Sequence, residues 1–406
     1  MRITTLWRRL VDVMSIFVIA VRWDGRALVL DVRPRWLKPR CGECGQCAPG
    51  YDRCGSRRWR SLSFGRTIVY LEYALRRVDC RDCGVRVERV PWAEHASWFT
   101  RAFEELVAYH VQATDKTTVT KLLGISWEAV GNIVERVVTR RLDRNRLNNV
   151  TRIGIDEFSY RKHHRYITVI VDHDTRRVIW TAEGTGAKTL RKFFEELGPE
   201  RTALLKLATI DMSGGYMKAL REHAPDVQIV FDRFHVQGLA GIAVDDVRRE
   251  LWRSEGTRRG HGVGGTRWAL LKNPVNLTGE QSEQLSHIQK TNKPLYRAYL
   301  LKEALREALM EPTVEAGRRT LAAWIEWACR SRLKPFVRLS RTIRLHLAGI
   351  LGYIEHNITN GVVEGINGRM RMVARRAFGF HSAPPLMAML FLCAGGIQLD
   401  PPLPTH

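Results

Sequence analysis

Two aspartates in the middle of the sequence stand directly after short apolar segments, a position typical of catalytic carboxylates. Asp156 follows Arg152-Ile-Gly-Ile, and Asp211 follows the apolar segment 204–210. Carboxylates are hard oxygen ligands that suit Mg²⁺ or Mn²⁺, and such ions complete their shell with water and substrate phosphate oxygens. Two ions about 3.5–4 Å apart activate an attacking hydroxyl and stabilise the leaving oxygen in displacement at phosphorus. One such aspartate alone more often forms a turn or a helix cap, so the prediction of metal-dependent phosphoryl transfer depends on the pair.

A third acid, Glu364, falls on a predicted helix that begins after Asn360. Asn367, Arg371 and Arg375 follow it at i+3, i+7 and i+11 and therefore share its face of the helix. An acid, an amide and two cations on one stripe fit a metal ligand beside bound phosphates. A solvated helix face held by salt bridges is the alternative interpretation.

The cysteines predict a second, structural metal site. Six of the eight cysteines fall within residues 41–83, and two C-x-x-C pairs there are each followed by glycine, which permits the tight turn of a zinc knuckle. The predicted zinc ligands are Cys41, Cys44, Cys80 and Cys83. Cys47 and Cys54 are reserve candidates that leave the ligand set open. Surplus thiols or a thioredoxin-like redox pair are the weaker alternatives, because no βαβ pattern surrounds either pair.

The elements expected to position Asp156 and Asp211 alternate between strands and helices from residue 151 onward. Strands are expected at 152–156, 165–172, 177–183, 204–210 and 227–231, and helices at 187–197 and 213–223. The order βββαβαβ is that of a ribonuclease-H-like domain with a mixed five-stranded sheet. In such a sheet the first and fourth strands lie side by side, so Asp156 and Asp211 are expected to meet in one crevice.

The 153 positions between Asp211 and Glu364 predict an inserted subdomain. Its apolar periodicity is helical throughout, while the Gly- and Arg-rich segment 253–267 is expected to be a mobile basic loop. Trp268 is a candidate for stacking on an unpaired base, although most helical tryptophans belong to a core. At the start of this region His235, in Asp232-Arg-Phe-His, is a candidate phosphate contact, or else a histidine that caps a strand.

The segment before residue 150 carries a possible DNA-binding motif. Two helices, one near 117–123 and one at 127–140, are separated by a break at Gly124, and Ser126 is a plausible N-cap for the second. Arg136 and Arg140 are expected to face outward from this second helix. An ordinary helical hairpin is the alternative. Upstream, arginines that alternate with aromatic residues between the cysteine pairs also suggest DNA contact; these are Arg57, Arg58, Arg60, Arg66, Arg76 and Arg77.

The overall charge agrees with a polyanionic partner. The 406 residues include 65 Lys and Arg, mostly Arg, against 42 Asp and Glu, a net charge of +23, although solubility alone is the simpler interpretation. No apolar stretch is long enough to span a bilayer. The apolar N-terminal segment alternates like a strand and continues through Asp24-Gly25, so a hairpin is expected there and not a secretory signal.

Several strings together resemble the insertion-sequence transposases of the ISL3 family, a DDE family. They are IGIDEFS, ATIDMSGGYMKAL, IVFDRFHV, GTRWALLKNP, ITNGVVEGINGRMRMVARRAFGF and, nearer the N-terminus, VPWAEH. The resemblance covers about residues 40–395 and implies that Asp156, Asp211 and Glu364 form the catalytic triad. It implies a bacterial cytoplasmic, nucleoid-associated enzyme that cleaves DNA at terminal inverted repeats and joins the 3′-hydroxyl to target DNA. A homodimer or larger synaptic complex is expected, since two ends must be held together.

Two other functions stay open: a nuclease of the same fold that only hydrolyses DNA, and a DNA-binding repressor with a decayed catalytic domain. The expected organisation is an N-terminal hairpin (1–36), a zinc-binding β module (37–95), a helix-turn-helix with basic linker (96–150), the first part of the catalytic domain (151–235), an all-α insertion (236–355), the last part of the catalytic domain (356–398) and a tail (399–406). The residues expected to contact DNA are Arg136, Arg140, Arg258, Arg259, Arg369, Arg371 and Arg375, with His235 and Asn367 as phosphate contacts.

Overall fold

The chain forms two compact units in the computed structural model. The structure describes residues 7, 15–161, 165–212, 214–259, 265–356, 358, 361–376 and 382–400, without the side chains of 254–259, 363, 364, 367, 370, 374 and 376. One unit comprises Met1–Leu142 with Ile397–His406, and the other comprises Asp143–Gly396. Within the described ranges, no helix has both the length and the apolar character required to cross a bilayer.

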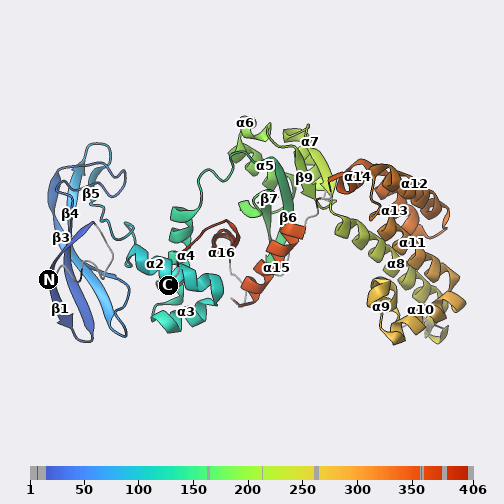
Figure 1. Cartoon of the computed structure of the whole chain (residues 1–406), viewed down its shortest axis with the longest axis horizontal. Helices are drawn as coiled ribbons and strands as arrows, with labels where there is room; N and C mark the ends of the chain where they lie inside the picture. The colour runs from blue at the N-terminus through green and yellow to red at the C-terminus, as the bar shows by residue number, and fades with distance from the viewer. Residues whose placement is uncertain are drawn as a thin grey trace. The chain divides into compact units, whose positions relative to one another are not determined.

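The first unit begins with a five-stranded sheet (Figure 1). Its strands are β1 (Ile16–Asp24), β2 (Ala27–Pro34), β3 (Gly50–Arg60), β4 (Ile68–Cys80) and β5 (Gly84–Val87), in the order β1-β2-β4-β3 with β5 on β4. β1 and β2 pair antiparallel through the turn at Asp24-Gly25, so the predicted hairpin is confirmed. Trp59 and Trp92 pack edge to face in the core of this sheet, with ring centroids 5.4 Å apart.

In the described part of the first unit, three helices follow the sheet. They are α2 (Arg101–Ala113), α3 (Lys116–Leu123) and α4 (Trp127–Arg141). Gly124 ends α3 in the left-handed conformation, and the Ser126 hydroxyl caps α4 by accepting a hydrogen bond from the Ala129 N–H at 3.1 Å. The predicted helical pair, its break and its cap are therefore confirmed.

A second five-stranded sheet forms the centre of the other unit. Its strands are β6 (Arg152–Arg161), β7 (Arg165–Asp172), β8 (Arg177–Glu183), β9 (Leu207–Ile210) and β10 (Gln228–Phe231), in the order β10-β9-β6-β7-β8. β9 pairs parallel with β6, which confirms the predicted neighbourhood of the first and fourth strands. The prediction that β6 ends at Asp156 was wrong: pairing with β7 carries the strand on to Arg161, so Asp156 lies within it.

Outside the segment between β10 and α15, five of the described helices accompany this sheet. They are α5 (Gly186–Leu197), α6 (Pro199–Thr202), α7 (Gly214–His223), α15 (Gly361–Arg376) and α16 (Ala383–Ala394). α5 packs on α7, α15 on β6, and α16 on β8. A Cβ atom added at Gly215 would lie 2.9 Å from the Gly186 Cα, so this glycine allows the starts of α5 and α7 to approach closely. The approach fixes the turn that follows Asp211.

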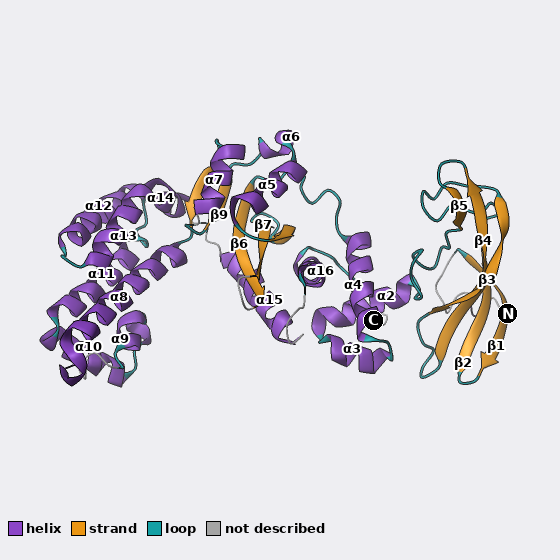
Figure 2. Cartoon of the chain, turned by 180° about the vertical axis from the view of Figure 1, so that it is seen from behind, coloured by secondary structure: helices purple, strands orange, loops and turns teal. Residues whose placement is uncertain are grey.

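The residues between β10 and α15 are helical, as expected (Figure 2). The helices are α8 (Arg233–Arg259), α9 (Arg267–Leu271), the 3₁₀ turn Pro274–Asn276, α10 (Gly279–Thr291), α11 (Lys293–Ala308), α12 (Val314–Arg330), α13 (Lys334–Leu345) and α14 (Leu347–His356). The expected basic loop at 253–267 is partly wrong, because α8 continues to Arg259. No proline interrupts that segment, and extending an existing helix costs little per residue. Residues 260–264 lie outside the described part of the chain.

Candidate active site and metal centre

Asp156 lies in β6 and Asp211 directly follows the neighbouring parallel strand β9. The strand register pairs Gly154 of β6 with Thr209 of β9, and each aspartate lies two residues beyond its member of that pair. Because strands alternate their side chains with a period of two and neighbouring strands lie about 4.8 Å apart, the two carboxylates emerge on the same face at adjacent positions. The arrangement suits two ligands of one metal centre.

Several charged and polar groups act on the carboxyl of Asp156. Burial raises the pKa of the Asp156 carboxyl, and the nearby Asp211 raises it further. The Glu157 backbone N–H, which donates to Asp156 Oδ1 at 2.7 Å, lowers that pKa, as do His235 and Arg371. Residues from β6, β9, α8 and α15 therefore converge on Asp156. A divalent cation bound there would favour the ionised carboxylate.

The helix that carries the predicted third acid lies beside Asp156. α15 packs against β6, as both views of the chain show (Figures 1 and 2). Glu364 and Asn367 belong to α15, but their side chains lie outside the described residues. Arg371, two helical turns after Glu364, exerts its charge on Asp156, and residues seven apart share one helix face. α15 therefore carries the charge of Arg371 to the neighbourhood of Asp156.

Asp232 and His235 form a hydrogen-bonded pair next to this group. Asp232 follows β10 directly and is fully buried, and its Oδ2 lies 3.2 Å from Nδ1 of His235. This hydrogen bond, aided by the charges of Asp232, Asp156 and Asp211, raises the pKa of the His235 imidazole. The sequence singled out the histidine as a phosphate contact, and the structure adds the buried carboxylate that orients it.

Glu157, next to Asp156, takes part in a different contact. Its carboxylate hydrogen-bonds the hydroxyl of Tyr216, a fully buried side chain of α7 whose oxygen lies 3.0 Å from Thr168 Oγ1. Burial raises the pKa of Glu157. The sequence analysis gave Tyr216 no role. The only signal for Tyr216 was its place after the Gly-Gly pair that opens α7.

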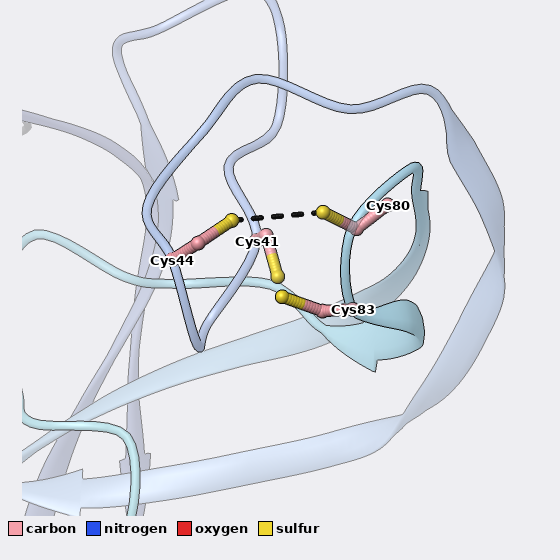
Figure 3. A group of neighbouring side chains, drawn as sticks. All are labelled: Cys41, Cys44, Cys80 and Cys83. Atoms are coloured by element: carbon pink, nitrogen blue, oxygen red, sulfur yellow. Dashed lines mark hydrogen bonds between the residues drawn. The ribbon is translucent and has the colours of Figure 1, made fainter.

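The first unit holds a group of four thiols at the end of β4 (Figure 3). The ligand atoms of Cys41, Cys44, Cys80 and Cys83 lie within 4.8 Å of one another, and the sulfurs of Cys44 and Cys80 are 3.6 Å apart. Gly45 and Gly84, which follow the two pairs, have φ angles of 75° and 70°, a conformation that glycine adopts without strain. Four sulfurs from two such turns fit the tetrahedral coordination of zinc.

The four thiols differ in acidity: the contact with Cys44 raises the pKa of Cys83 to about 12, whereas the backbone favours the thiolate of Cys80. Backbone N–H groups of Asp82 and Cys83 lower the pKa of Cys80 to about 7. Cys47 is exposed, and Cys54 packs beside the core of the sheet; neither belongs to the four-thiol group. These observations fit four ligands and leave Cys47 and Cys54 outside the set.

The arginines predicted to face outward from α4 are instead paired inside the first unit. Arg136 Nε and Arg140 Nη1 lie 2.7 and 3.1 Å from the carboxylate of Glu104, which is fully buried in α2. A buried carboxylate requires such partners, which is why the expected outward orientation was wrong. These ion pairs occupy part of the donor capacity of both arginines.

The remaining predicted DNA contacts lie in two helices of the second unit. Arg258 and Arg259 end α8, with side chains outside the described residues. In α15, Arg371 and Arg375 are exposed, whereas Arg369 donates a hydrogen bond to the Cys393 carbonyl at 3.3 Å.

Comparisons with known proteins find similarity to transposases. A family model described as a transposase matches residues 153–390, and one described as the helix-turn-helix domain of transposase family ISL3 matches residues 88–138. The transposase for insertion sequence element IS1557 of Mycobacterium tuberculosis is 40% identical over 401 residues, which cover 92% of this chain and 90% of the relative. The transposase for IS1001 of Bordetella parapertussis is 28% identical over 370 residues, 89% and 91% of the two chains.

Proposed function

The chain belongs to the ISL3 family of insertion-sequence transposases, and from this premise we propose that it binds terminal inverted repeats and catalyses metal-dependent DNA cleavage and strand transfer. The observation that supports the catalytic part is the matched register of Asp156 and Asp211 on adjacent parallel strands beside α15. The strand order supports a ribonuclease-H-like fold. In this sheet β7 runs antiparallel to β6 and β8, and β9 and β10 run parallel to β6.

In this proposal Asp156, Asp211 and Glu364 hold two Mg²⁺ or Mn²⁺ ions. Bound there, such ions supply Lewis-acid activation of a water or 3′-hydroxyl and charge stabilisation at the leaving oxygen. Arg371 and Arg375 contact the DNA phosphates that approach along α15. His235, held by Asp232, donates a hydrogen bond to the phosphate that is attacked, with Asn367 as a second donor. Both cleavage and joining then occur by direct phosphoryl transfer, with no covalent bond between DNA and protein.

The rest of the chain serves recognition and assembly. We assign 37–95 to a zinc-stabilised module, 96–150 to DNA binding, 236–355 to an insertion, and 151–235 with 356–398 to catalysis. The DNA partners are the transposon ends and the target, held by a homodimer or larger synaptic complex. Since the substrate is chromosomal DNA, the enzyme acts in the bacterial cytoplasm at the nucleoid. Metal analysis of the purified protein should find stoichiometric zinc, which substitution of Cys41 or Cys80 by Ser should remove.

A donor-plasmid assay tests the catalytic assignment. The plasmid carries a marker between the element's own ends, and cleaved and joined products are measured with Mg²⁺ present. D156N, D211N and E364Q should each lose both products by at least about a thousandfold while still binding the ends. D174N is the matched control. Asp174 is an exposed carboxylate that pairs with Arg152, and Arg152 begins β6, the strand that carries Asp156.

The same assay separates the alternative functions. Nicked donor without any joined product would identify a hydrolytic nuclease. A wild-type protein that binds the ends but leaves them intact would identify a repressor. Continued excision by D156N would overturn the assignment of the triad.

A further inference from the structure

A hydrogen bond joins the residue that follows Asp156 to the helix that follows Asp211. Glu157 is the next residue of β6, and Tyr216 lies in the first turn of α7, close after Asp211 in the chain. The Tyr216 hydroxyl hydrogen-bonds the Glu157 carboxylate. The strand that carries one acid is therefore tied directly to the helix next to the other.

The Tyr216 hydroxyl is held between two strands. Thr168 of β7 lies opposite Glu157 in the strand register, and its Oγ1 is 3.0 Å from the Tyr216 oxygen. The Thr168 hydroxyl also donates to the Gly184 carbonyl at 2.8 Å. Tyr216 and Thr168 are both fully buried, where the loss of a hydrogen-bond partner is costly. Burial and several partners together fix the position of the hydroxyl.

Glycines bring the backbones of α5 and α7 close enough for this contact. The Cβ atom that any other residue would add at Gly215 lies only 2.9 Å from the Gly186 Cα. The Gly186 N–H donates to the Tyr216 hydroxyl. α7 therefore begins at a defined place against α5, and only two residues separate that start from Asp211.

Tyr216 lies on the face of the sheet opposite to Asp156. Side chains alternate along a strand, so Glu157 shares its face with Ile153 and Ile155, which pack in the same core cluster as Tyr216. Asp156 emerges on the other face. Tyr216 is therefore placed to affect the acids through the backbone and not by contact with DNA.

We propose that Tyr216 is a positioning residue of the catalytic centre, whose hydroxyl, held by Glu157 and Thr168, sets the separation of the Asp156 and Asp211 carboxylates. Mg²⁺ tolerates little departure from octahedral geometry, so carboxylates that are already in place bind it more tightly. Outer contacts of this kind typically change metal affinity about ten- to a hundredfold. The inference rests on the proposed catalytic function and adds a residue behind the sheet that acts through the acids.

Binding of Mn²⁺ to the full-length protein without DNA tests the proposal. Titration calorimetry measures the affinity, and the part of the signal that D156N lacks defines the site. Y216F removes only the hydroxyl and should weaken Mn²⁺ binding about tenfold. In the donor-plasmid assay the Mg²⁺ concentration for half-maximal cleavage should rise by a similar factor, while the rate at saturating Mg²⁺ stays within about threefold of the wild-type rate.

Matched variants separate positioning from general damage. Y299F removes the hydroxyl of another buried tyrosine, in α11, and should bind Mn²⁺ as the wild type does. T168V removes a partner of the Tyr216 hydroxyl at nearly constant shape and should weaken Mn²⁺ binding. T168S keeps a hydroxyl and should bind Mn²⁺ within about twofold of the wild-type affinity. The pair T168V and T168S carries the test if Y216F does not fold.

Two results would overturn the inference. One is Mn²⁺ binding by Y216F and T168V that equals binding by the wild type. The other is a cleavage defect of Y216F that saturating Mg²⁺ does not relieve. Wild-type Mn²⁺ binding that D156N leaves unchanged would instead contradict the proposed metal centre itself.

Discussion

A hydrogen bond with Asp232 orients His235 near Asp156 and Asp211. Asp232 is buried and can only accept, so its contact with Nδ1 requires that nitrogen to carry the proton when the imidazole is neutral. We predict that D232N slows DNA cleavage about ten- to a hundredfold without changing the affinity for the ends, since the histidine loses its fixed orientation. Single-turnover cleavage rates with saturating DNA measure the effect.

The double variant distinguishes orientation from general damage. If Asp232 acts through His235, D232N/H235A should cleave no more slowly than H235A. Rate losses that multiply in the double variant would show that Asp232 acts independently of the histidine. Urea unfolding of D232N provides the control for a purely structural loss.

From the burial of His173 we predict that the stability of the second unit depends on pH. Its Nε2 lies 2.7 Å from Thr209 Oγ1, and burial, with Arg152, lowers its pKa below 6.5, against the opposing effect of Asp172 and Asp174. At pH values below the pKa that His173 has in the unfolded chain, the unfolded chain therefore binds more protons than the folded one. The contribution of His173 to the free energy of unfolding is fully present above about pH 6.5. It is lost as the pH falls through the pKa that His173 has in the folded protein.

The variant H173Q isolates this contribution. Glutamine retains an amide that can bond Thr209 but has no proton to gain in this range. The free energy of unfolding, measured from pH 7.5 down to pH 5, should fall more steeply for the wild type than for H173Q. Parallel curves for the two proteins would refute the assignment.

At the scale of elements, Glu104 joins α2 to α4. Removing one partner of a buried ion pair leaves the others uncompensated, at a cost of about 3 kcal/mol or more. We predict that E104A destabilises the first unit by this amount, because Arg136 and Arg140 lose their carboxylate and Ser97 loses its acceptor. Hydrogen exchange of the α2 and α4 amides in the full-length protein measures the loss where it occurs.

The adjacent residue is the matched control. Glu105 pairs with Arg140 and Arg141 but is partly exposed, so E105A should cost less than about 1 kcal/mol. Equal effects of E104A and E105A would mean that burial of the carboxylate does not determine the stability of this junction.

The elements show how far the sequence alone leads. Apolar periodicity predicts β7, β8 and α5 almost to the residue, and the Ser126 cap predicts the start of α4. These features depend on neighbours in sequence. The orientation of Arg136 depends on Glu104, 32 positions away, and β6 continues past Asp156 because β7 pairs with it, so neither was predictable locally. The proximity of Asp156 to Asp211 was predictable, because the strand order makes β6 and β9 neighbours.

At the scale of the whole molecule, the total of 65 Lys and Arg residues overstates the number of cations available to DNA. Several arginines of the first sheet, predicted from sequence to contact DNA, are engaged within it: Arg58 pairs with Glu72 and Asp24, Arg76 with Glu88, and Arg77 with Asp52. Such pairs contribute no net charge to a DNA-binding face. Sequence-independent affinity must therefore come from smaller sets of exposed cations, and their position matters more than their number.

The salt dependence of DNA binding tests whether the exposed arginines of α15 form such a set of DNA-binding cations. Each phosphate contact that is lost lowers the slope of log K against log salt concentration by about one. R371A/R375A removes two exposed cations of α15 and should lower the slope by about two. R338A/R341A removes the same charge from an exposed stripe of α13 and should leave the slope nearly unchanged. Because both variants alter the net charge equally, equal slopes would show that overall charge, and not the α15 face, governs binding.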